Sequence, residues 1–423
     1  MSAFGTGSNS NGQFWYGNYG FLYKKNTGVG ARRSTKFNPG GNITCNSQTY
    51  LYNKYKPGGG GVGASSVSNR RAKNRLATVC VKNSCFPCYT TLGQYSNYTH
   101  NPNGYVPCYA NQINPCSFSG ILSYFIANLG SFTDFGLSVA WSNDGSKIAI
   151  SAPNISSGIG NGVVYIVNAL TGSLMNTITN NVSQNGFGFC LSWSPDNSKL
   201  AVGAPAENVN SGVIYILNPN DGSTFYKINN PNSSTAFGSS VSWSHDGTKI
   251  ATSNAYNGGI SNVYVLDALN GALMYTINSI SGTGTAFGFG LSWSPDGTKL
   301  AIGTPVYNSS IGIVYIVNSA NGNLISSVNS FTNTNDSFGY SVAWSSDGNQ
   351  LAIGSPSYSN GNGIVYIVNP NTNNLLSVIN YNASSGSGFG CGLSWSPCDQ
   401  SKTKLAIGAA SYNESSGIVY IFK

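Results

Sequence analysis

Charged residues are scarce in this sequence: Asp, Glu, Lys and Arg make up 8% of its 423 residues. Globular domains typically carry about 25%. It has only two histidines and three methionines, and no apolar run approaches the roughly 20 residues of a membrane-spanning helix. The amino terminus, MSAFGTGSNSNGQFWYG, lacks the basic residue and the apolar core run of a signal peptide. These absences argue against membrane insertion and secretion by the usual route.

Acidic residues are absent from the first 116 positions, which hold twelve Lys and Arg. Residues 117–423 hold the other eight Lys and Arg and all twelve Asp and Glu, so the two parts carry +12 and −4, which sum to +8. This segregation predicts an acidic partner for the basic part, such as nucleic acid, an anionic surface or the acidic face of another protein. We expect two domains, 1–116 and 117–423.

Six repeated segments, each beginning with Phe-Gly, fill the chain from Phe135 to its end. A Trp follows each Phe by six residues, and successive Trp residues lie 52, 50, 50, 51 and 51 positions apart. These residues are Trp141, Trp193, Trp243, Trp293, Trp344 and Trp395. A period near 50 with strand-like content is typical of β-propellers.

One repeat, residues 287–328, shows the expected blade. The strands GLSWS and KLAIG flank a turn that contains Asp296-Gly297, a strong hairpin signal, and IVYIV and LISSV complete four strands. The sixth repeat lacks its fourth strand, whereas residues 121–126 supply one ahead of the first repeat. The sequence therefore predicts an all-β fold: a six-bladed β-propeller with velcro closure, preceded by an extended irregular arm.

The repeats resemble two propeller families. The S-x-D-G-x-K-[IL]-A segment is similar to WD-repeat and TolB-type propellers, and the Phe-Gly start and Gly203-Ala204-Pro205 are similar to the Phe-Gly/Gly-Ala-Pro repeats of integrin alpha chains. Integrin-type blades often hold calcium in a D-x-[DN]-x-[DN]-G-x-x-D loop. The corresponding loops here, such as 154–162 and 207–212, lack that acidic ladder. The resemblance implies the fold and no calcium site.

No arrangement of residues typical of catalysis is evident. Acid–base chemistry needs positioned His or paired carboxylates, but His245 occupies a Ser-His-Asp-Gly turn and His100 a polar loop. Five aspartates recur in the same turn, where Asp bonds to the local backbone: Asp144, Asp196, Asp246, Asp296 and Asp347. Weak cation binding by this ring is the alternative. We expect the repeated Trp residues to pack blade against blade, with sugar binding as the alternative, and the protein not to be an enzyme.

The first 116 residues show no helical or alternating periodicity. They are rich in Gly, Asn and Tyr and too poor in aliphatic residues to build a core easily, yet Tyr and Arg are enriched at protein interfaces. We expect an anchoring arm that orders when it is bound. Six basic residues are the predicted partner-binding set: Arg32, Arg33, Arg70, Arg71, Lys73 and Arg75.

Six of the nine cysteines belong to this arm: Cys45, Cys80, Cys85, Cys88, Cys108 and Cys116. An even number in a region without a core predicts staples. These are either up to three disulfides or a zinc site that uses the only C-x-x-C pair, although zinc sites usually combine two such pairs. We expect no other cofactor. The remaining cysteines, Cys190, Cys391 and Cys398, are expected to be free or locally paired.

Three segments of the arm resemble an amino-terminal module of virion-associated proteins in large DNA viruses of the mimivirus-like algal group. They are KKNTGVGARRSTKFNPGG, SNRRAKNRLATVC and CFPCYTTLGQYSNYTHNPNGYVPC, and the similarity spans roughly residues 21–108. The resemblance implies a minor capsid or capsid-decorating protein of a virion assembled in the host cytoplasm. It transfers no active site.

Three functions are compatible with the sequence. The first is a structural virion component whose arm binds capsid proteins of the same particle and displays the propeller. The second is a host-attachment propeller that binds a surface glycan or receptor through its loops. The third is nucleic-acid binding by the arm, where Arg and Lys alternate with Tyr, although no known nucleic-acid fold accompanies the charge. We expect the first.

Overall fold

The computed structural model describes residues 117–423 apart from 157–160, 181–185, 233, 256–260, 281–285, 382–385 and 400–401, together with the backbone of six short strands ahead of residue 117. The chain divides into two compact units, Met1–Ile113 and Asn114–Lys423. None of the described helices is long and apolar enough to cross a membrane.

The strands described in the first unit form three antiparallel pairs. They are β1 (Gln13–Tyr16) with β2 (Leu22–Lys25), β3 (Asn42–Cys45) with β4 (Gln48–Leu51), and β5 (Arg75–Val81) with β6 (Ser84–Thr90). Each pair joins strands that are neighbours in the sequence. β1 to β4 have four residues each, too few to show the alternation of a sheet face, and the seven residues of β5 and of β6 do not alternate regularly between apolar and polar, so the sequence indicated only an irregular arm there.

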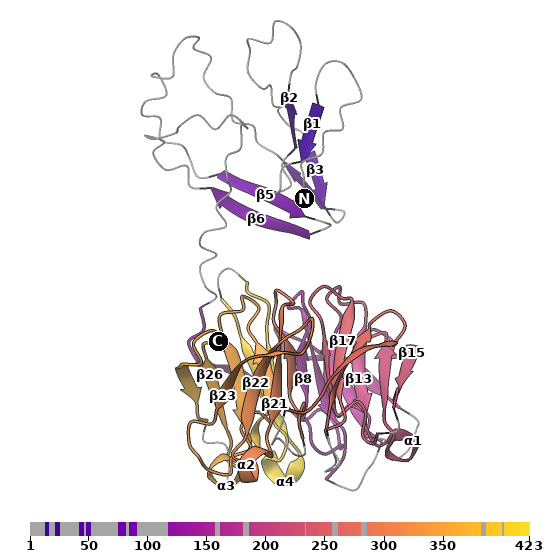
Figure 1. The fold of residues 1–423 in the computed structure, drawn as a ribbon, viewed down its shortest axis with the longest axis vertical. Coiled ribbons are helices and arrows are strands. Elements are labelled where there is room, and N and C mark those ends of the chain that lie inside the picture. Colours follow the sequence, from indigo (N-terminus) through magenta and orange to yellow (C-terminus); the bar gives the residue numbers. More distant parts are fainter. Residues whose placement is uncertain are drawn as a thin grey trace, which may run out of the picture. The chain divides into compact units, whose positions relative to one another are not determined.

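The second unit is a ring of six four-stranded antiparallel sheets, which confirms the predicted six-bladed propeller (Figure 1). Blades 1 to 3 are β8 (Val139–Trp141), β9 (Lys147–Ala152), β10 (Val163–Asn168) and β11 (Leu174–Thr179); β12 (Leu191–Trp193), β13 (Leu200–Ala204), β14 (Val213–Leu217) and β15 (Thr224–Asn229); and β16 (Ser240–Trp243), β17 (Lys249–Ser253), β18 (Val263–Asp267) and β19 (Leu273–Ile277).

Blades 4 to 6 repeat this order. They are β20 (Leu291–Trp293), β21 (Lys299–Thr304), β22 (Ile313–Asn318) and β23 (Leu324–Asn329); β24 (Ser341–Trp344), β25 (Leu351–Ser355), β26 (Ile364–Val368) and β27 (Leu375–Ile379); and β28 (Phe389–Trp395), β29 (Leu405–Ala409), β30 (Ile418–Phe422) and β7 (Leu122–Ala127). The first strands of the blades surround the central channel, and the fourth strands lie outermost.

The ring closes as the sequence predicted, by a strand from the other end of the propeller. In blade 6, β7 pairs antiparallel with β30, which places Ile418 opposite Ala127 and Val419 opposite Ile126. The first strand of blade 6, β28, also contacts β8 of blade 1. The velcro closure therefore leaves no open edge between the first and last blades.

The hydrophobic core lies between the blades rather than in one centre. Six clusters of buried residues each combine apolar side chains of two neighbouring blades, and every repeated Trp belongs to one of them. Three of the indoles donate a hydrogen bond to the preceding blade: Trp193 to the carbonyl of Ala140, Trp293 to that of Ser242, and Trp395 to that of Ala343, each at 3.0 Å. This confirms the blade-to-blade packing expected for these residues.

Four short helical turns connect the second and third strands of their blades. They are α1 (Glu207–Asn210), α2 (Tyr307–Ser310), α3 (Tyr358–Gly361) and α4 (Tyr412–Ser415). In Figure 1 they lie together at one end of the strands. We call this end the mouth rim and the opposite end, which carries the Asp-Gly turns, the turn rim.

Candidate ligand pocket at the mouth of the central channel

The Phe-Gly motif fixes the start of each channel strand. The residue before the Phe is left-handed in all six blades, with φ between 59° and 72°, and the Gly after it has φ between 85° and 93°. Each Phe is buried and contacts the Tyr of the third strand, with ring centroids 5.4 to 6.1 Å apart. This anchor determines which side chains come next along the channel.

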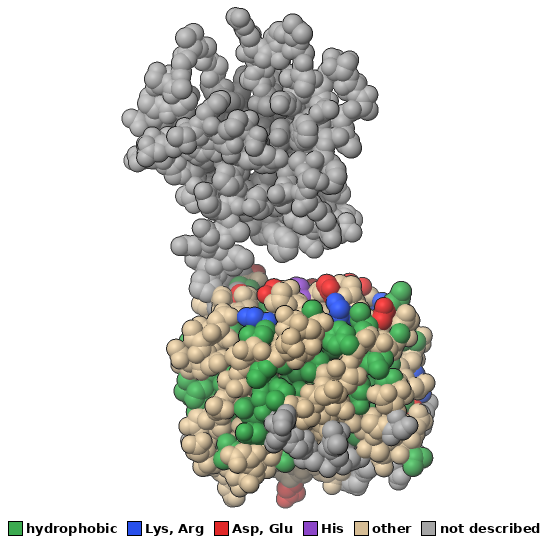
Figure 2. All heavy atoms as spheres, viewed as in Figure 1, with side chains coloured by type: hydrophobic (Ala, Val, Ile, Leu, Met, Phe, Trp, Pro, Cys, Tyr) green, Lys and Arg blue, Asp and Glu red, His purple; other side chains and the backbone are tan. Residues whose placement is uncertain are grey.

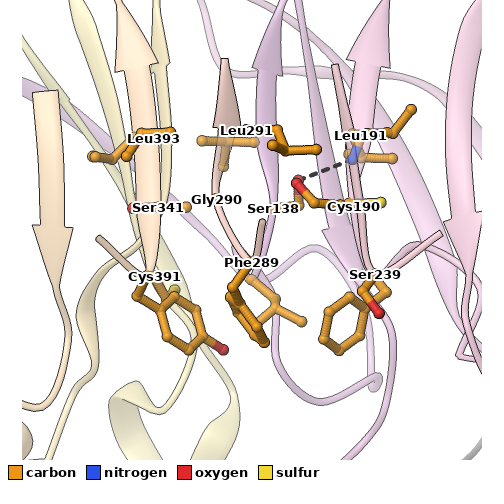
Figure 3. A pocket seen from close by; sticks show the side chains of 18 residues that line it. Ser138, Cys190, Leu191, Ser239, Phe289, Gly290, Leu291, Ser341, Cys391 and Leu393 are labelled. Atoms are coloured by element: carbon orange, nitrogen blue, oxygen red, sulfur yellow. Dashed lines mark hydrogen bonds between the residues drawn. The ribbon is translucent and has the colours of Figure 1, made fainter. Parts of the chain in front are cut away.

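Three rings of side chains line the channel, one residue from each blade in each ring (Figure 3). The first ring is Leu137, Phe189, Ser239, Phe289, Tyr340 and Cys391. The second contains only Ser, Cys and Gly, and the third alternates Val and Leu around the axis. Because the small second ring lies between two larger ones, a cavity of about 90 Å³ remains inside the channel.

Aromatic side chains of the first ring meet across the channel. The rings of Phe189 and Phe289, from blades 2 and 4, make an edge contact with centroids 6.1 Å apart. Phe289 also contacts Tyr340 of blade 5, with centroids 4.4 Å apart. The first ring therefore holds an aromatic cluster in place of an open passage.

A larger funnel, about 610 Å³ in volume, lies outside this ring at the mouth rim. First-ring residues, among them Phe189 and Tyr340, form its floor. Its walls come from loops of blades 1, 5 and 6: Ile155, Ser156, Pro356, Ser357, Asn360, Gly361, Gly386, Gly388, Ala410 and Ser411. This volume lies within the range of roughly 300–1,000 Å³ that is usual for small-molecule sites.

Helical turns α3 and α4 border the funnel with an unusual backbone. In α3, Ser359, Asn360 and Gly361 have φ of 48°, 61° and 84°, so three successive residues are left-handed. That conformation is unfavourable for most side chains and least so for Gly and Asn. The amide of Gly363 donates to the carbonyl of Tyr358 at 3.0 Å and closes the turn. The funnel wall is therefore held in place by the backbone itself.

Asp134 is the one carboxylate among the residues that line the funnel. It is 6% exposed and accepts hydrogen bonds from the amides of Ile155 (2.6 Å) and Ser156 (2.9 Å) and from the hydroxyls of Thr133 (2.9 Å) and Ser156. These hydrogen bonds hold Ile155 and Ser156, the loop residues by which blade 1 contributes to the funnel wall. The carboxylate is thus occupied by internal donors, and the funnel presents neutral groups.

The turn rim concentrates the charged side chains of the propeller (Figure 2). Asp296 accepts hydrogen bonds from the Ser294 hydroxyl (2.5 Å) and the Thr298 amide (3.0 Å), and the other repeated turns use the same pattern. Partial burial would raise the pKa, but these hydrogen bonds hold it below its usual value at Asp144, Asp196, Asp246 and Asp296. The predicted local role of these aspartates is confirmed.

Other residues singled out in the sequence are placed as follows. His245 is exposed in its turn, and His100 lies outside the described residues. Within the described part of the chain, no three His, Cys, Asp or Glu side chains gather as a metal site would require.

The predicted partner-binding residues cannot be placed as side chains: Arg32, Arg33, Arg70, Arg71, Lys73 and Arg75 lie outside the described side chains. The same holds for Cys45, Cys80, Cys85, Cys88, Cys108 and Cys116. The backbone of β5 and β6 places Cys80 opposite Cys85 in the strand register. The choice between disulfides and zinc therefore remains a prediction.

The three cysteines of the propeller differ from one another. Cys190 and Cys391 are buried free thiols beside the channel, and burial raises both pKa values, that of Cys391 to about 12. Cys398 is disulfide-bonded. Cys190 and Cys391 are free, as expected, and the partner of Cys398 lies outside the described residues, so that a local pairing of Cys398 stays a prediction. The sequence contained no signal for this link.

No family model matches the chain, and no curated protein matches it. Among solved structures it is similar to a chain of the mitotic checkpoint complex (18% identity, 68% of this chain and 75% of that one, TM-score 0.44). It is also similar to the Cps50 (Swd1) β-propeller domain of Myceliophteria thermophila (12%, 72% and 99%, 0.48) and to TolB from Acinetobacter baumannii (19%, 57% and 54%, 0.41). The assignment of the chain as a six-bladed β-propeller rests on its own sheets rather than on these similarities.

Proposed function

We propose that this chain is a structural virion component, a minor capsid or capsid-decorating protein. Its basic amino-terminal region binds neighbouring capsid proteins, and its propeller is displayed as a rigid, non-catalytic module. The observation that carries the proposal is the separation of charge: residues 1–116 carry +12 and no acidic residue, and the propeller carries the rest of the charge. Such a region favours an acidic partner.

The propeller is suited to display on a particle surface because many of its polar side chains find hydrogen-bond partners within the propeller itself. Many of its carboxylates accept local hydrogen bonds at the turns and in the loops. For example, Glu207 is 6% exposed and accepts from the Tyr215 hydroxyl (2.5 Å) and from Lys227 (3.2 Å). Catalysis requires a titratable group that is free to exchange protons with a substrate. Carboxylates such as Glu207, Asp134 and Asp296 instead accept hydrogen bonds that stabilise loops and turns.

The virion setting is supported by the resemblance of the arm to modules of mimivirus-like algal viruses and by the low charge content. In this proposal the protein is assembled in the host cytoplasm and its partners are capsid proteins of the same particle. The salt dependence of binding distinguishes a protein partner from a nucleic acid, because nucleic-acid binding weakens steeply as the salt concentration rises and counterions compete.

The test replaces all six predicted partner-binding residues by Ala in the full-length chain: Arg32, Arg33, Arg70, Arg71, Lys73 and Arg75. Incorporation into purified virus particles is measured by quantitative mass spectrometry against the major capsid protein. We expect a loss of at least about tenfold, since each tenfold step corresponds to only about 1.4 kcal/mol of binding. Normal incorporation would contradict the proposal.

The matched control replaces four lysines of the turn rim by Ala: Lys147, Lys199, Lys249 and Lys299. This removes a similar amount of positive charge from the propeller and should leave incorporation unchanged. Equal losses in both variants would mean that total charge, and not the arm, directs the protein to the particle. Association with particles that persists in high salt supports a capsid partner, and release by salt supports nucleic acid instead.

A further inference from the structure

We propose that the funnel at the channel mouth binds a neutral saccharide of one or two sugar rings. The proposal deepens the second candidate function, attachment to a glycan, and is independent of what the arm binds. It rests on three properties of the funnel: its aromatic floor, its wall of small polar side chains, and its lack of an available charge.

The floor offers aromatic faces at the bottom of a concave site. Tyr340 is half-buried and packs against the Phe289 ring, with centroids 4.4 Å apart and the ring planes tilted by 49°. A Tyr ring combines a flat apolar face with a polar hydroxyl. The apolar C–H face of a sugar ring matches such a surface.

The walls offer hydroxyl and amide groups, of which the Ser357 hydroxyl also makes a hydrogen bond with the Ser337 hydroxyl at 2.9 Å. Ser357 and Ser411 precede α3 and α4, where the equivalent residues of blades 2 and 4 are Ala206 and Val306. All four have nearly the same backbone conformation, with φ between −92° and −85° and ψ between −5° and 1°. The serines are therefore not needed to form the turn, and they occur where the funnel is.

The charge of the funnel favours a neutral ligand over an ionic one. Its carboxylate, Asp134, is surrounded by internal donors, and the Cys391 thiol stays protonated because burial raises its pKa to about 12. An ionic ligand would lose hydration without meeting a counter-ion. A neutral sugar exchanges hydrogen bonds to water for hydrogen bonds to Ser and Asn groups.

The test is saturation-transfer NMR on the full-length chain with a defined panel. The neutral members are glucose, galactose, mannose, N-acetylglucosamine, lactose and cellobiose, and the charged members are sialic acid and glucosamine. Each is offered at about 5 mM, which detects dissociation constants in the millimolar range. We expect saturation transfer to at least one neutral sugar and none to the charged members.

Two variants locate the site, and both use residues that the chain itself carries at equivalent positions. Tyr340→Leu introduces the residue found at Leu137 and should weaken binding about tenfold, the equivalent of about 1.4 kcal/mol. Ser357→Val combined with Ser411→Ala introduces the residues of blades 4 and 2. This double variant should weaken binding about fivefold, as expected for losing about 1 kcal/mol of hydrogen bonding.

The matched control is Val306→Ser combined with Ala206→Ser, which adds two hydroxyls at the same turn position outside the funnel. It should bind like the unmodified chain. Absence of binding to every neutral sugar, binding to charged members alone, or full binding in both funnel variants would overturn the proposal. Thermal melting identifies any variant that fails to fold, and the double serine variant then decides the result. Particle incorporation of the same variants shows separately whether the arm still functions.

Discussion

The two rims of the propeller are built from the same repeat, yet the same side chains recur at one rim and vary at the other. At the turn rim, each Asp receives the same bonds from a Ser two residues earlier and from an amide two residues later. At the mouth rim, α1 to α4 share one left-handed backbone but carry different side chains. A side chain that recurs from blade to blade together with its hydrogen bonds stabilises the fold. Side chains that vary over this constant backbone have different roles: Glu207 bonds to Tyr215 and Lys227, whereas Ser357 and Ser411 line the funnel.

The largest effect is expected where the mouth rim meets the channel strands. Gly339 has φ of 86°, and a Cβ there would lie 3.0 Å from the Ile313 carbonyl oxygen and 3.0 Å from a methyl of Val314. Strained backbone and overpacking together predict that Gly339→Ala lowers the free energy of unfolding by about 4 kcal/mol. Denaturant unfolding followed by circular dichroism measures this change.

The control for this variant lies at the turn rim. Gly297 has φ of 70°, but a Cβ there would meet nothing within 4 Å. Gly297→Ala should therefore cost only the left-handed backbone, about 1 kcal/mol. Equal losses in the two variants would show that backbone conformation alone, and not the close contact between blades, makes Gly necessary in the Phe-Gly motif.

The sequence predicted the propeller well because its defining features are local and repeat six times. The Phe-Gly start, the Trp six residues later and the Asp-Gly turn each have a bonding role that one repeat reveals and five others confirm. Velcro closure followed from counting strands, and the structure places that strand at Leu122–Ala127, one residue later than expected. The periodicity of the sequence was therefore enough to predict most of the fold.

The funnel could not be predicted from the sequence in the same way. Its floor comes from the residue after Phe-Gly in four of the blades, where Leu137, Phe189, Tyr340 and Cys391 share no chemical character. Its walls are short turns with positive φ at residues such as Ser359, for which the sequence has no clear signal. Only the closure of the ring brings blades 1, 5 and 6 to one mouth, and that juxtaposition is a property of the tertiary structure.

The second prediction concerns the disulfide bond of Cys398, whose partner lies outside the described residues. Ser117 bridges to Lys402, and its carbonyl accepts from the Thr403 amide at 3.3 Å. Since consecutive Cα atoms are about 3.8 Å apart, we expect Cys116 to be the partner. Non-reducing peptide mapping should recover this pair, and Cys398→Ser should lower the free energy of unfolding by about 3 kcal/mol.

The matched control is Cys190→Ser, at a buried thiol that is not bonded to another cysteine. It should leave the peptide map unchanged. Recovery of Cys398 with any other cysteine would contradict the expected pairing. A reduced Cys398 in the native protein would contradict the disulfide itself.

The smallest effects are expected from pH, and they should have opposite signs at the two rims. Partial burial would raise the pKa of Asp296, but bonds from Ser294 and Thr298 outweigh it and lower the value. Burial raises the pKa of Asp336, which is 1% exposed near the mouth rim and accepts a hydrogen bond from the Thr332 hydroxyl at 2.6 Å. The two carboxylates therefore respond differently to the same change in pH.

For Asp296 the unfolded chain takes up its proton first as the pH falls, so its stabilisation is complete above a pH of about 4 and disappears as the pH drops through the lower folded pKa. For Asp336 the folded chain takes up its proton first, so its charge opposes folding at neutral pH and that cost disappears below about pH 4. Thermal melting from pH 7 to pH 3 should show Asp296→Asn less stable and Asp336→Asn more stable at pH 7, each by less than about 1 kcal/mol. Both differences should shrink toward pH 3. A loss of stability in both variants at pH 7 would mean that the buried carboxylate stabilises the mouth rim by its bonds, as the turn aspartates do on the other side.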